Sequence, residues 1–197
     1  MKNNLKSFAV VAISLVFVLG CSFLQKVKEQ TENNDKKDVI TSKDGKTQLT
    51  VPASWDKELK VNNDASIQAG SIMKGQYAIV ISEPKNTLGA KLSLTEYANL
   101  VRKAAEKNIM VTEMKTGEPT SVTVGGLPGT QFEADGTAAG LHLNWIYTIV
   151  ETPENFHQVM TWSPSTSFET NKPVLLEVTN SFKELSGTSA PPASNKK

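Results

Sequence analysis

The chain contains a single cysteine, Cys21, among its 197 residues. A lone thiol cannot form a disulfide within the chain, so the fold has to be held together by a packed apolar core. Removing the first 21 of the 197 residues leaves 176, which is enough for one domain that buries such a core.

Cys21 closes a stretch that is typical of a secretory signal. Lys2 and Lys6 form a short basic region, and an almost unbroken apolar run follows over Phe8–Leu19. This run of about 12 residues is shorter than the roughly 20 that a helix needs to span a bilayer. An uncleaved anchor is the alternative interpretation, because counting through Leu24 lengthens the apolar run to about 17 residues.

The four residues Val18-Leu19-Gly20-Cys21 resemble the bacterial lipobox, although Leu19 stands where a small residue is usual. The resemblance implies cleavage after Gly20 and lipid modification of Cys21, with more than one acyl chain for a stable anchor. A protein released in soluble form is the alternative. Ser22, and not aspartate, follows the cysteine, which by analogy with lipoprotein sorting in Gram-negative bacteria favours the outer membrane.

Polar, aperiodic segments flank the remainder of the chain. We therefore expect a signal peptide over residues 1–20, a lipidated cysteine with a flexible tether over 21–38, a domain over 39–185 and a disordered tail over 186–197. Without Lys2 and Lys6, 19 basic residues stand against 20 acidic ones. This balance gives no polybasic patch for nucleic acid, and we expect the membrane and a protein of unknown identity as partners.

The domain is predicted to be α+β, with an antiparallel sheet flanked by two helices. Asp44-Gly45 is typical of a hairpin turn, and Ser93 with Glu96 forms a capping box that opens a helix over about 94–107. A second helix is expected within 171–185, with Pro173 in its first turn. Strands are expected over 39–41, 47–51, 66–74, 76–82, 109–115, 120–124, 130–135, 141–151 and 156–162, of which 76–82 should be central.

Several short motifs in this order resemble the PsbP-like family. They are Val51-Pro52-Ala53-Ser54-Trp55, the Ser93-capped helix, Gly126-Leu127-Pro128-Gly129, Lys172-Pro173-Val174 and Ser181-Phe182-Lys183. The family includes photosystem extrinsic proteins and small bacterial lipoproteins of the DcrB type. The resemblance implies an α/β/α sandwich over about 39–185 and a non-enzymatic role in binding proteins or assisting assemblies. It transfers no functional residue, because no family site motif is present.

Catalytic chemistry is not expected. If the chain turns at Pro153-Glu154, His157 pairs with about Val150 and lies roughly 26 Å from His142, too far to share a metal ion. Glu133 and Asp135 are typical of a solvated strand face, with a weak cation site as the alternative. The glycines of 125–129 lack the Gly-Lys-Ser/Thr element of a phosphate loop, so no cofactor, metal or catalytic residue is predicted.

Four aromatic residues form the candidate partner or ligand surface: Trp55, Trp145, Tyr147 and Trp162. Packing in the core beneath a helix is the alternative interpretation for each of them. The sequence thus predicts a membrane-anchored envelope lipoprotein that acts as a non-catalytic binding or accessory module. The alternative is a small-molecule carrier with a pocket between the sheet and a helix.

Overall fold

The computed structural model describes residues 36–88, 91–108 and 110–185. The predicted signal segment, Cys21 and the predicted tail over 186–197 lie outside the described residues. The chain divides into two compact units, residues 38–51 with 55–197 and residues 1–37 with 52–54. In the second unit the Ala53 amide donates a hydrogen bond to the Lys36 carbonyl at 2.9 Å.

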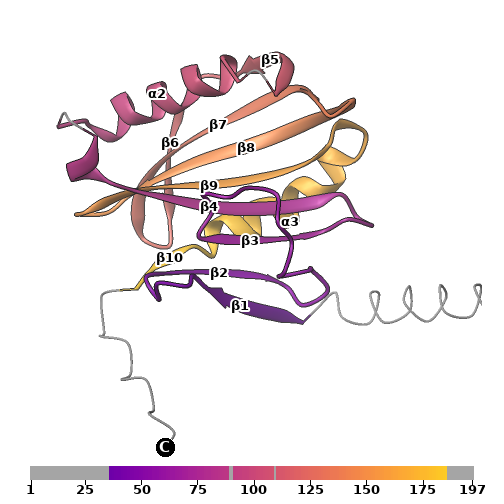
Figure 1. Ribbon diagram of the computed structural model, residues 1–197, viewed down its shortest axis with the longest axis horizontal. Coiled ribbons are helices and arrows are strands. Elements are labelled where there is room, and N and C mark those ends of the chain that lie inside the picture. The colour runs from indigo at the N-terminus through magenta and orange to yellow at the C-terminus, as the bar shows by residue number, and fades with distance from the viewer. Residues whose placement is uncertain (1–35, 89–90, 109, 186–197) are drawn as a thin grey trace, which may run out of the picture. The chain divides into compact units, whose positions relative to one another are not determined.

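An antiparallel sheet of seven strands dominates the described fold (Figure 1). Its strand order is β3-β4-β9-β8-β7-β5, with β6 paired to β7. The strands are β3 (Ile67–Ser71), β4 (Gln76–Pro84), β5 (Val111–Thr116), β6 (Thr120–Val124), β7 (Leu127–Ala138), β8 (Leu141–Glu151) and β9 (Asn155–Pro164). A second sheet has the order β1-β2-β10 and consists of β1 (Lys37–Thr41), β2 (Thr47–Pro52) and β10 (Lys183–Glu184).

The register between β8 and β9 is the one predicted from the turn at Pro153-Glu154. His157 lies opposite Val150, and Trp162 lies opposite Trp145. Because successive side chains of a strand alternate between faces, this register fixes which residues of β8 and β9 lie together on each side of the sheet.

Each face of the sheet is covered by one helix. Helix α2 (Leu94–Glu106) packs on β5, β7 and β8, and α3 (Phe168–Asn180) packs on β9, β4 and β8. The sides they cover are called the α2 face and the α3 face. The buried core of the α2 face contains Tyr97, Ala98, Val101, Ala105, Phe132, Ala134, Trp145, Tyr147, Ile149 and Phe156. The core of the α3 face includes Trp55, Ile67, Val80, Ile146, Val150, Val159, Leu175 and Phe182.

Helix α2 begins at the predicted capping box. Ser93 accepts a hydrogen bond from the Glu96 amide, and the Glu96 carboxylate accepts one from the Ser93 amide. These two bonds satisfy backbone donors that have no partner within a helix.

The second predicted helix is correct in existence and wrong in its bounds. It begins at Phe168, so Pro173 lies inside the helix and not in its first turn, and it ends at Asn180. Phe168 is 3% exposed, because its side chain is buried against the sheet. This tertiary contact extends the helix on the N-terminal side of the apolar repeat from which it was predicted. Phe182 and Leu185, which were expected on the helix, follow it.

Two further expectations need correction. Strand β4 is an interior strand but lies next to edge strand β3, so it is not central. The segment Leu127–Gly129, which precedes the strand predicted over 130–135, already belongs to β7, and the turn before it is formed by Gly125 and Gly126. Both glycines have positive φ, the backbone conformation for which glycine is suited.

Within the described residues, no helix combines the length and the apolar character needed to cross a bilayer.

The capping box gives a direct test of how α2 is held. Replacing Ser93 by Ala removes the side-chain acceptor and should lower the free energy of unfolding by about 1 kcal/mol. For a domain of this size, thermal denaturation should show a fall in Tm of roughly 2–4 °C. Ser93→Asp keeps an acceptor at the N-cap and is the matched control, which should unfold close to the wild type. Equal losses in both variants would contradict this role of the cap.

Candidate functional site

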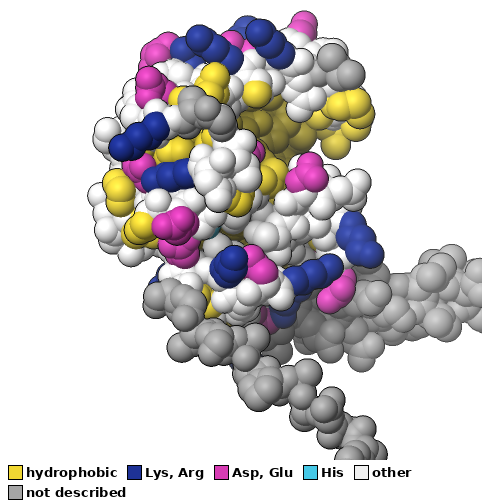
Figure 2. Space-filling model, turned by 60° about the vertical axis from the view of Figure 1, so that its left-hand side comes forward, with side chains coloured by type: hydrophobic (Ala, Val, Ile, Leu, Met, Phe, Trp, Pro, Cys, Tyr) yellow, Lys and Arg dark blue, Asp and Glu magenta, His cyan; other side chains and the backbone are white. Residues whose placement is uncertain are grey.

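A groove of about 490 Å³ lies between α2 and the sheet and is called the α2 groove. Its helical wall is formed by Tyr97, Leu100, Val101, Ala104, Ala105 and Asn108, its floor by Glu83, Tyr147, Gln158 and Met160, and one end by Leu88 and Leu92. Helix α2 packs mainly on β5, β7 and β8 and contacts β9 through Tyr97, and the groove lies beside this contact. Figure 2 shows a hollow lined by hydrophobic side chains beneath a band of charged ones.

Tyr147 is the most informative residue of this groove. Its ring stacks on Phe132 with centroids 4.9 Å apart, and the residue is 8% exposed. Burial raises the pKa of the Tyr147 hydroxyl to about 12, and no described residue hydrogen-bonds that hydroxyl. The hydroxyl oxygen is not one of the fully buried atoms that lack a partner, so it is accessible from the groove and can hydrogen-bond to water or to an occupant.

A second polar feature lies where β9 faces the start of α2. The Gln158 amide donates hydrogen bonds to the Tyr97 hydroxyl at 2.8 Å and to the Glu83 carboxylate at 3.2 Å. Burial raises the pKa of Tyr97, and the neighbouring Glu83 adds to the rise although the Gln158 bond opposes it. Tyr97 also stacks on Phe156 with centroids 4.3 Å apart, so its ring is firmly placed.

The charge of the groove restricts its ligands. Among the described residues that line it, Glu83 alone carries a charge, and that charge is negative. Lys85, which directly follows β4, is ion-paired with Glu151 at 2.8 Å and does not line the groove. An anionic ligand would therefore meet repulsion without a compensating cation, whereas a neutral apolar molecule would not.

The structure places three of the four predicted aromatic residues on the α2 face. Trp145 and Trp162 are cross-strand neighbours, and Trp162 stacks on Tyr77 with centroids 5.3 Å apart. Of the predicted residues, Tyr147 lines the groove. Trp55 lies in the core of the α3 face, 2% exposed, with its indole N–H donating to Gln76 at 3.2 Å. The four do not form one surface, and a binding role for them stays a prediction.

The other sequence candidates for chemistry lie on the α3 face. Glu133 forms an ion pair with Lys172 at 2.7 Å. His142 Nε2 is 4.0 Å from an Asp135 carboxylate oxygen, and both residues, with Glu113, border a separate hollow of about 380 Å³. In the described part of the chain, no three His, Cys, Asp or Glu side chains are grouped so that they could hold a metal ion.

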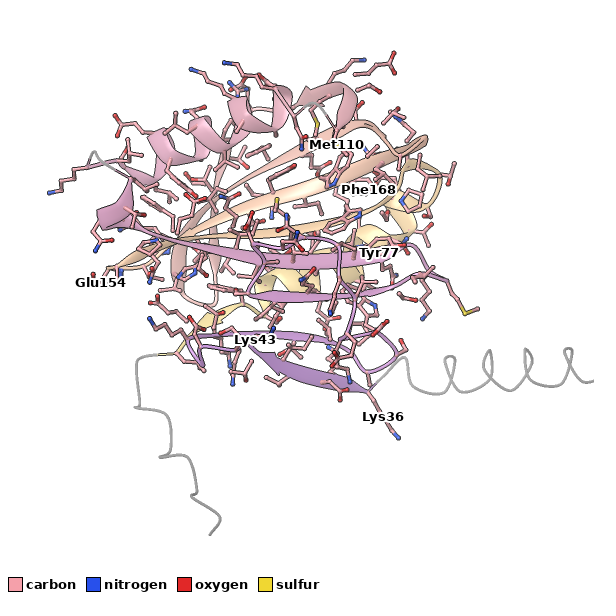
Figure 3. The ribbon with its side chains drawn as sticks, in the orientation of Figure 1. Lys36, Lys43, Tyr77, Met110, Glu154 and Phe168 are labelled. Carbon is pink, nitrogen blue, oxygen red and sulfur yellow. The ribbon has the colours of Figure 1, made fainter. Side chains whose placement is uncertain are left out.

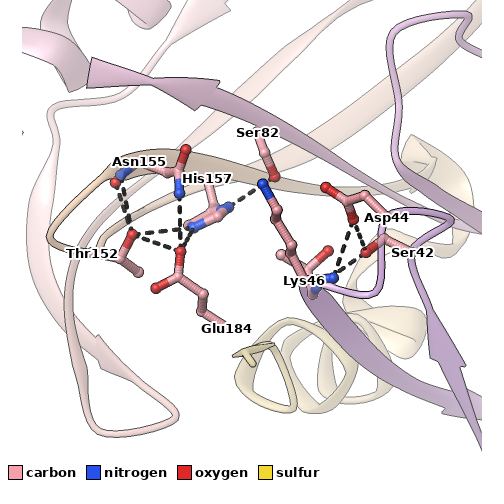
Figure 4. Close-up of polar contacts among 9 residues, drawn as sticks. Ser42, Asp44, Lys46, Ser82, Thr152, Asn155, His157 and Glu184 are labelled. Atoms are coloured by element: carbon pink, nitrogen blue, oxygen red, sulfur yellow. Dashed lines mark hydrogen bonds and ion pairs between the residues drawn. The ribbon is translucent and has the colours of Figure 1, made fainter. Parts of the chain in front are cut away.

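His157 lies at the opposite end of the sheet from His142, in a buried polar network (Figure 4). Its Nδ1 is 2.8 Å from the Ser82 hydroxyl, and its Nε2 is 3.1 Å from the Glu184 carboxylate. Thr152 and Asn155 also donate to Glu184, at 2.9 and 3.1 Å. Because Glu184 belongs to β10, the network joins the large sheet to the small one.

Burial lowers the pKa of His157, against the opposing attraction of Glu184, so the ring is neutral. Burial on its own would raise the pKa of Glu184, but the hydrogen bonds from Asn155, Thr152 and His157 together lower it. An ionised carboxylate only accepts, so Nε2 donates to Glu184 and Nδ1 accepts from Ser82. The order serine–histidine–carboxylate is that of a nucleophilic relay, yet neither Ser82 nor His157 lines the α2 groove or the hollow beside His142.

This network could not be predicted from the sequence, because its members come from distant segments. Ser82 lies opposite His157 through the β4–β9 pairing, and Glu184 arrives through β10. The predicted β8–β9 turn was the one available signal, since it places Thr152 and Asn155 beside His157.

A further hollow, of about 550 Å³, is bordered by residues from the segments 40–44 and 57–68. Lys43, Asp44, Lys57, Glu58 and Lys60 all line it. Charges of both signs in an exposed setting are typical of a solvated surface, so the α2 groove is the stronger candidate site.

The neutral state of His157 predicts a loss of stability in mild acid. A lowered folded pKa means that the unfolded chain takes up the proton first, so stability is full above about pH 6.5 and falls as the pH drops below it. Urea denaturation at about pH 7.5 and about pH 5.5 should show this loss in the wild type and in His142→Gln. His157→Gln should show much less pH dependence. An unchanged pH dependence in His157→Gln would contradict the assignment.

No protein-family model matches the sequence, and no curated protein matches it. Solved structures are similar in fold. The solution structure of cyanobacterial PsbP (CyanoP) from Synechocystis sp. PCC 6803 matches with a TM-score of 0.56 and 11% identity, covering 76% of this chain and 92% of CyanoP. LpqN of Mycobacterium tuberculosis matches with a TM-score of 0.54 and 12% identity, covering 80% of this chain and 95% of LpqN. The chain therefore has the PsbP-like α+β fold, as the sequence predicted.

Proposed function

We propose that this chain is a lipid-anchored, non-catalytic binding or accessory module of the bacterial cell envelope, and that its α2 groove binds a small molecule. The observation that carries the binding role is the groove itself, whose lining is mostly apolar and includes the accessible hydroxyl of Tyr147.

The envelope assignment rests on two supports. The first is the basic, apolar and lipobox-like order of residues that ends at Cys21. The second is the fold shared with LpqN, a protein described as involved in cell envelope biogenesis. Because this chain and LpqN are 12% identical, LpqN supports the fold of this chain. A role of this chain in the cell envelope is part of the proposal.

The dimensions of the groove favour a small molecule over a folded protein. Its volume of about 490 Å³ lies in the range of roughly 300–1,000 Å³ that is usual for small-molecule sites. A stable protein interface needs about 800 Å² from each partner, which is a broader surface than one groove beside one helix. A small molecule can also reach the Tyr147 hydroxyl, because Tyr147 is 8% exposed.

The lining defines the class of ligand. Leucine, valine, alanine and methionine side chains suit an apolar body, and Tyr147 suits one hydrogen-bonding group. The carboxylate of Glu83 disfavours an acid. We therefore assign the groove to neutral or cationic molecules that are mostly apolar.

The anchor is tested by replacing Cys21. Wild-type protein should fractionate with membranes, take up labelled fatty acid, and accumulate in precursor form when lipoprotein signal peptidase is blocked. Cys21→Ser lacks the thiol that would carry the lipid, so it should lose both the fatty-acid label and the membrane association. Fatty-acid labelling of the Cys21→Ser protein at the wild-type level would contradict the anchor.

The groove is tested with two related dyes. N-phenyl-1-naphthylamine is neutral, whereas 1-anilinonaphthalene-8-sulfonate is a similar molecule with a negative charge. The neutral dye should bind at least roughly tenfold more tightly than the anionic one, because the Glu83 carboxylate repels the sulfonate. A loss of about 1.4 kcal/mol in binding free energy corresponds to a tenfold lower affinity. Fluorescence titration of both dyes measures the ratio, and Glu83→Gln should narrow it.

The same titration locates the dye. Ala104→Trp places a large ring in the groove from an exposed position of α2 and should abolish binding of the neutral dye. Lys103→Trp adds the same ring at the neighbouring exposed position, which does not line the groove, and should leave binding unchanged. Equal affinities of the two variants would contradict the assignment of the groove.

A further inference from the structure

Exposed apolar side chains are distributed unequally between the two ends of the large sheet. Four large hydrophobic residues lie at one end, which is called the apolar end: Ile72 (70% exposed), Met73 (57%), Met110 (76%) and Leu141 (60%). Ile72 and Met73 are in the β3–β4 turn, Met110 directly precedes β5, and Leu141 begins β8 after the β7–β8 turn.

The pairing registers show that these positions share one end. Tyr77, which follows the β3–β4 turn, lies opposite Trp162, and Trp162 lies opposite Trp145 near the start of β8. Leu141 pairs with Ala138, and Ala138 in turn pairs with Val111, the residue after Met110. Figure 3 labels Tyr77 and Met110 on this side and Glu154 at the other end of the sheet.

The turns at the other end are polar. They are Ser42–Lys46 between β1 and β2, Gly125-Gly126 between β6 and β7, and Thr152–Glu154 between β8 and β9. None of these described turns contains an exposed large hydrophobic residue. The contrast is therefore between two ends of the same strands, about 33 Å apart along the ten residues of β9.

The described domain unit begins near the apolar end. Asp38, the first residue of the domain unit, forms an ion pair with Lys57. The neighbouring residue Asp56 exchanges two backbone hydrogen bonds with Gly70, which pairs with Tyr77 at the β3–β4 turn. The domain unit thus begins at Asp38, whose partner Lys57 directly follows the residue that pairs with Gly70 of β3.

We propose that the apolar end is the surface with which this protein contacts the membrane that holds its lipid anchor. The inference rests on the proposed anchor at Cys21. Ile72, Met73, Met110 and Leu141 enter the interfacial region of the bilayer, and the half-buried Tyr77 and Trp162 stand just behind them, as aromatic side chains do at membrane interfaces.

The arrangement of these residues suits a lipid surface better than a protein. They are spread across the strand order from β4 to β5, a distance on the order of 19 Å, and not gathered in one cluster. A protein interface concentrates its binding energy in a compact, well-packed centre. A bilayer is an extended surface, which several separated apolar side chains can contact at the same time. The anchor keeps the end at an effective concentration near millimolar, so weak contacts suffice.

The test measures the depth of single positions in reconstituted lipoprotein. In the mature chain the Cys21 sulfur is alkylated, so an introduced cysteine is the one free thiol. Ile72→Cys and Leu141→Cys report on the apolar end, and Glu154→Cys on the polar end; all three positions are exposed, which leaves the core intact. Each variant is labelled with a thiol-reactive NBD dye and reconstituted into phosphatidylcholine–phosphatidylglycerol vesicles with and without brominated lipid.

Quenching by brominated lipid should be roughly threefold or more stronger at residues 72 and 141 than at residue 154, because only interfacial side chains reach the bromine atoms. Equal quenching at both ends, stronger quenching at residue 154, or no quenching at any site would overturn the proposed orientation. Flotation of the unsubstituted protein with the vesicles separates this failure from failure of the anchor. If that protein does not float, or takes up the thiol label at Cys21, the anchor and this proposal fall together.

Discussion

The pairing of β8 with β9 is the constraint on which the remaining structure depends. Its register places Trp145 beside Trp162 on the α2 face and Val150 beside His157 on the α3 face. A slip of one residue would exchange the faces of an entire strand, moving Tyr147 out of the groove and His157 out of its buried network. With a single cysteine in the chain, no disulfide can restore that register, so it depends on the burial of both faces.

The two faces and the two ends of this sheet serve different purposes. On the α3 face, helix α3 buries apolar residues such as Leu175, which is 0% exposed, and this side is a closed core. On the α2 face, the helix packs mainly on β5, β7 and β8 and contacts β9 through Tyr97, and the groove lies beside this contact. One end is closed by the polar network of His157, and the other presents exposed hydrophobic tips. The proposed lipid anchor would hold the domain at a membrane, and the proposed ligand of the groove is a small apolar molecule.

The features that could be predicted from the sequence are those determined by neighbouring residues. The capping box at Ser93, the Asp44-Gly45 turn and the alternation along β8 depend on local geometry, and each is present in the structure. The network at His157 could not be predicted, because β10 pairs with β2 across most of the chain. Phe168 begins α3 through tertiary burial, and the groove follows from the placement of α2, which no periodicity encodes.

The central claim is that the α2 groove holds a small molecule while the lipid on Cys21 holds the domain. Native mass spectrometry of the mature protein, extracted gently from its own membranes, tests both parts in one spectrum. We expect the mass of the chain from Cys21 onward with its acyl groups, together with a second species that is heavier by one small, releasable molecule. A spectrum that shows the lipidated chain alone, at every extraction condition that preserves the fold, would contradict the claim.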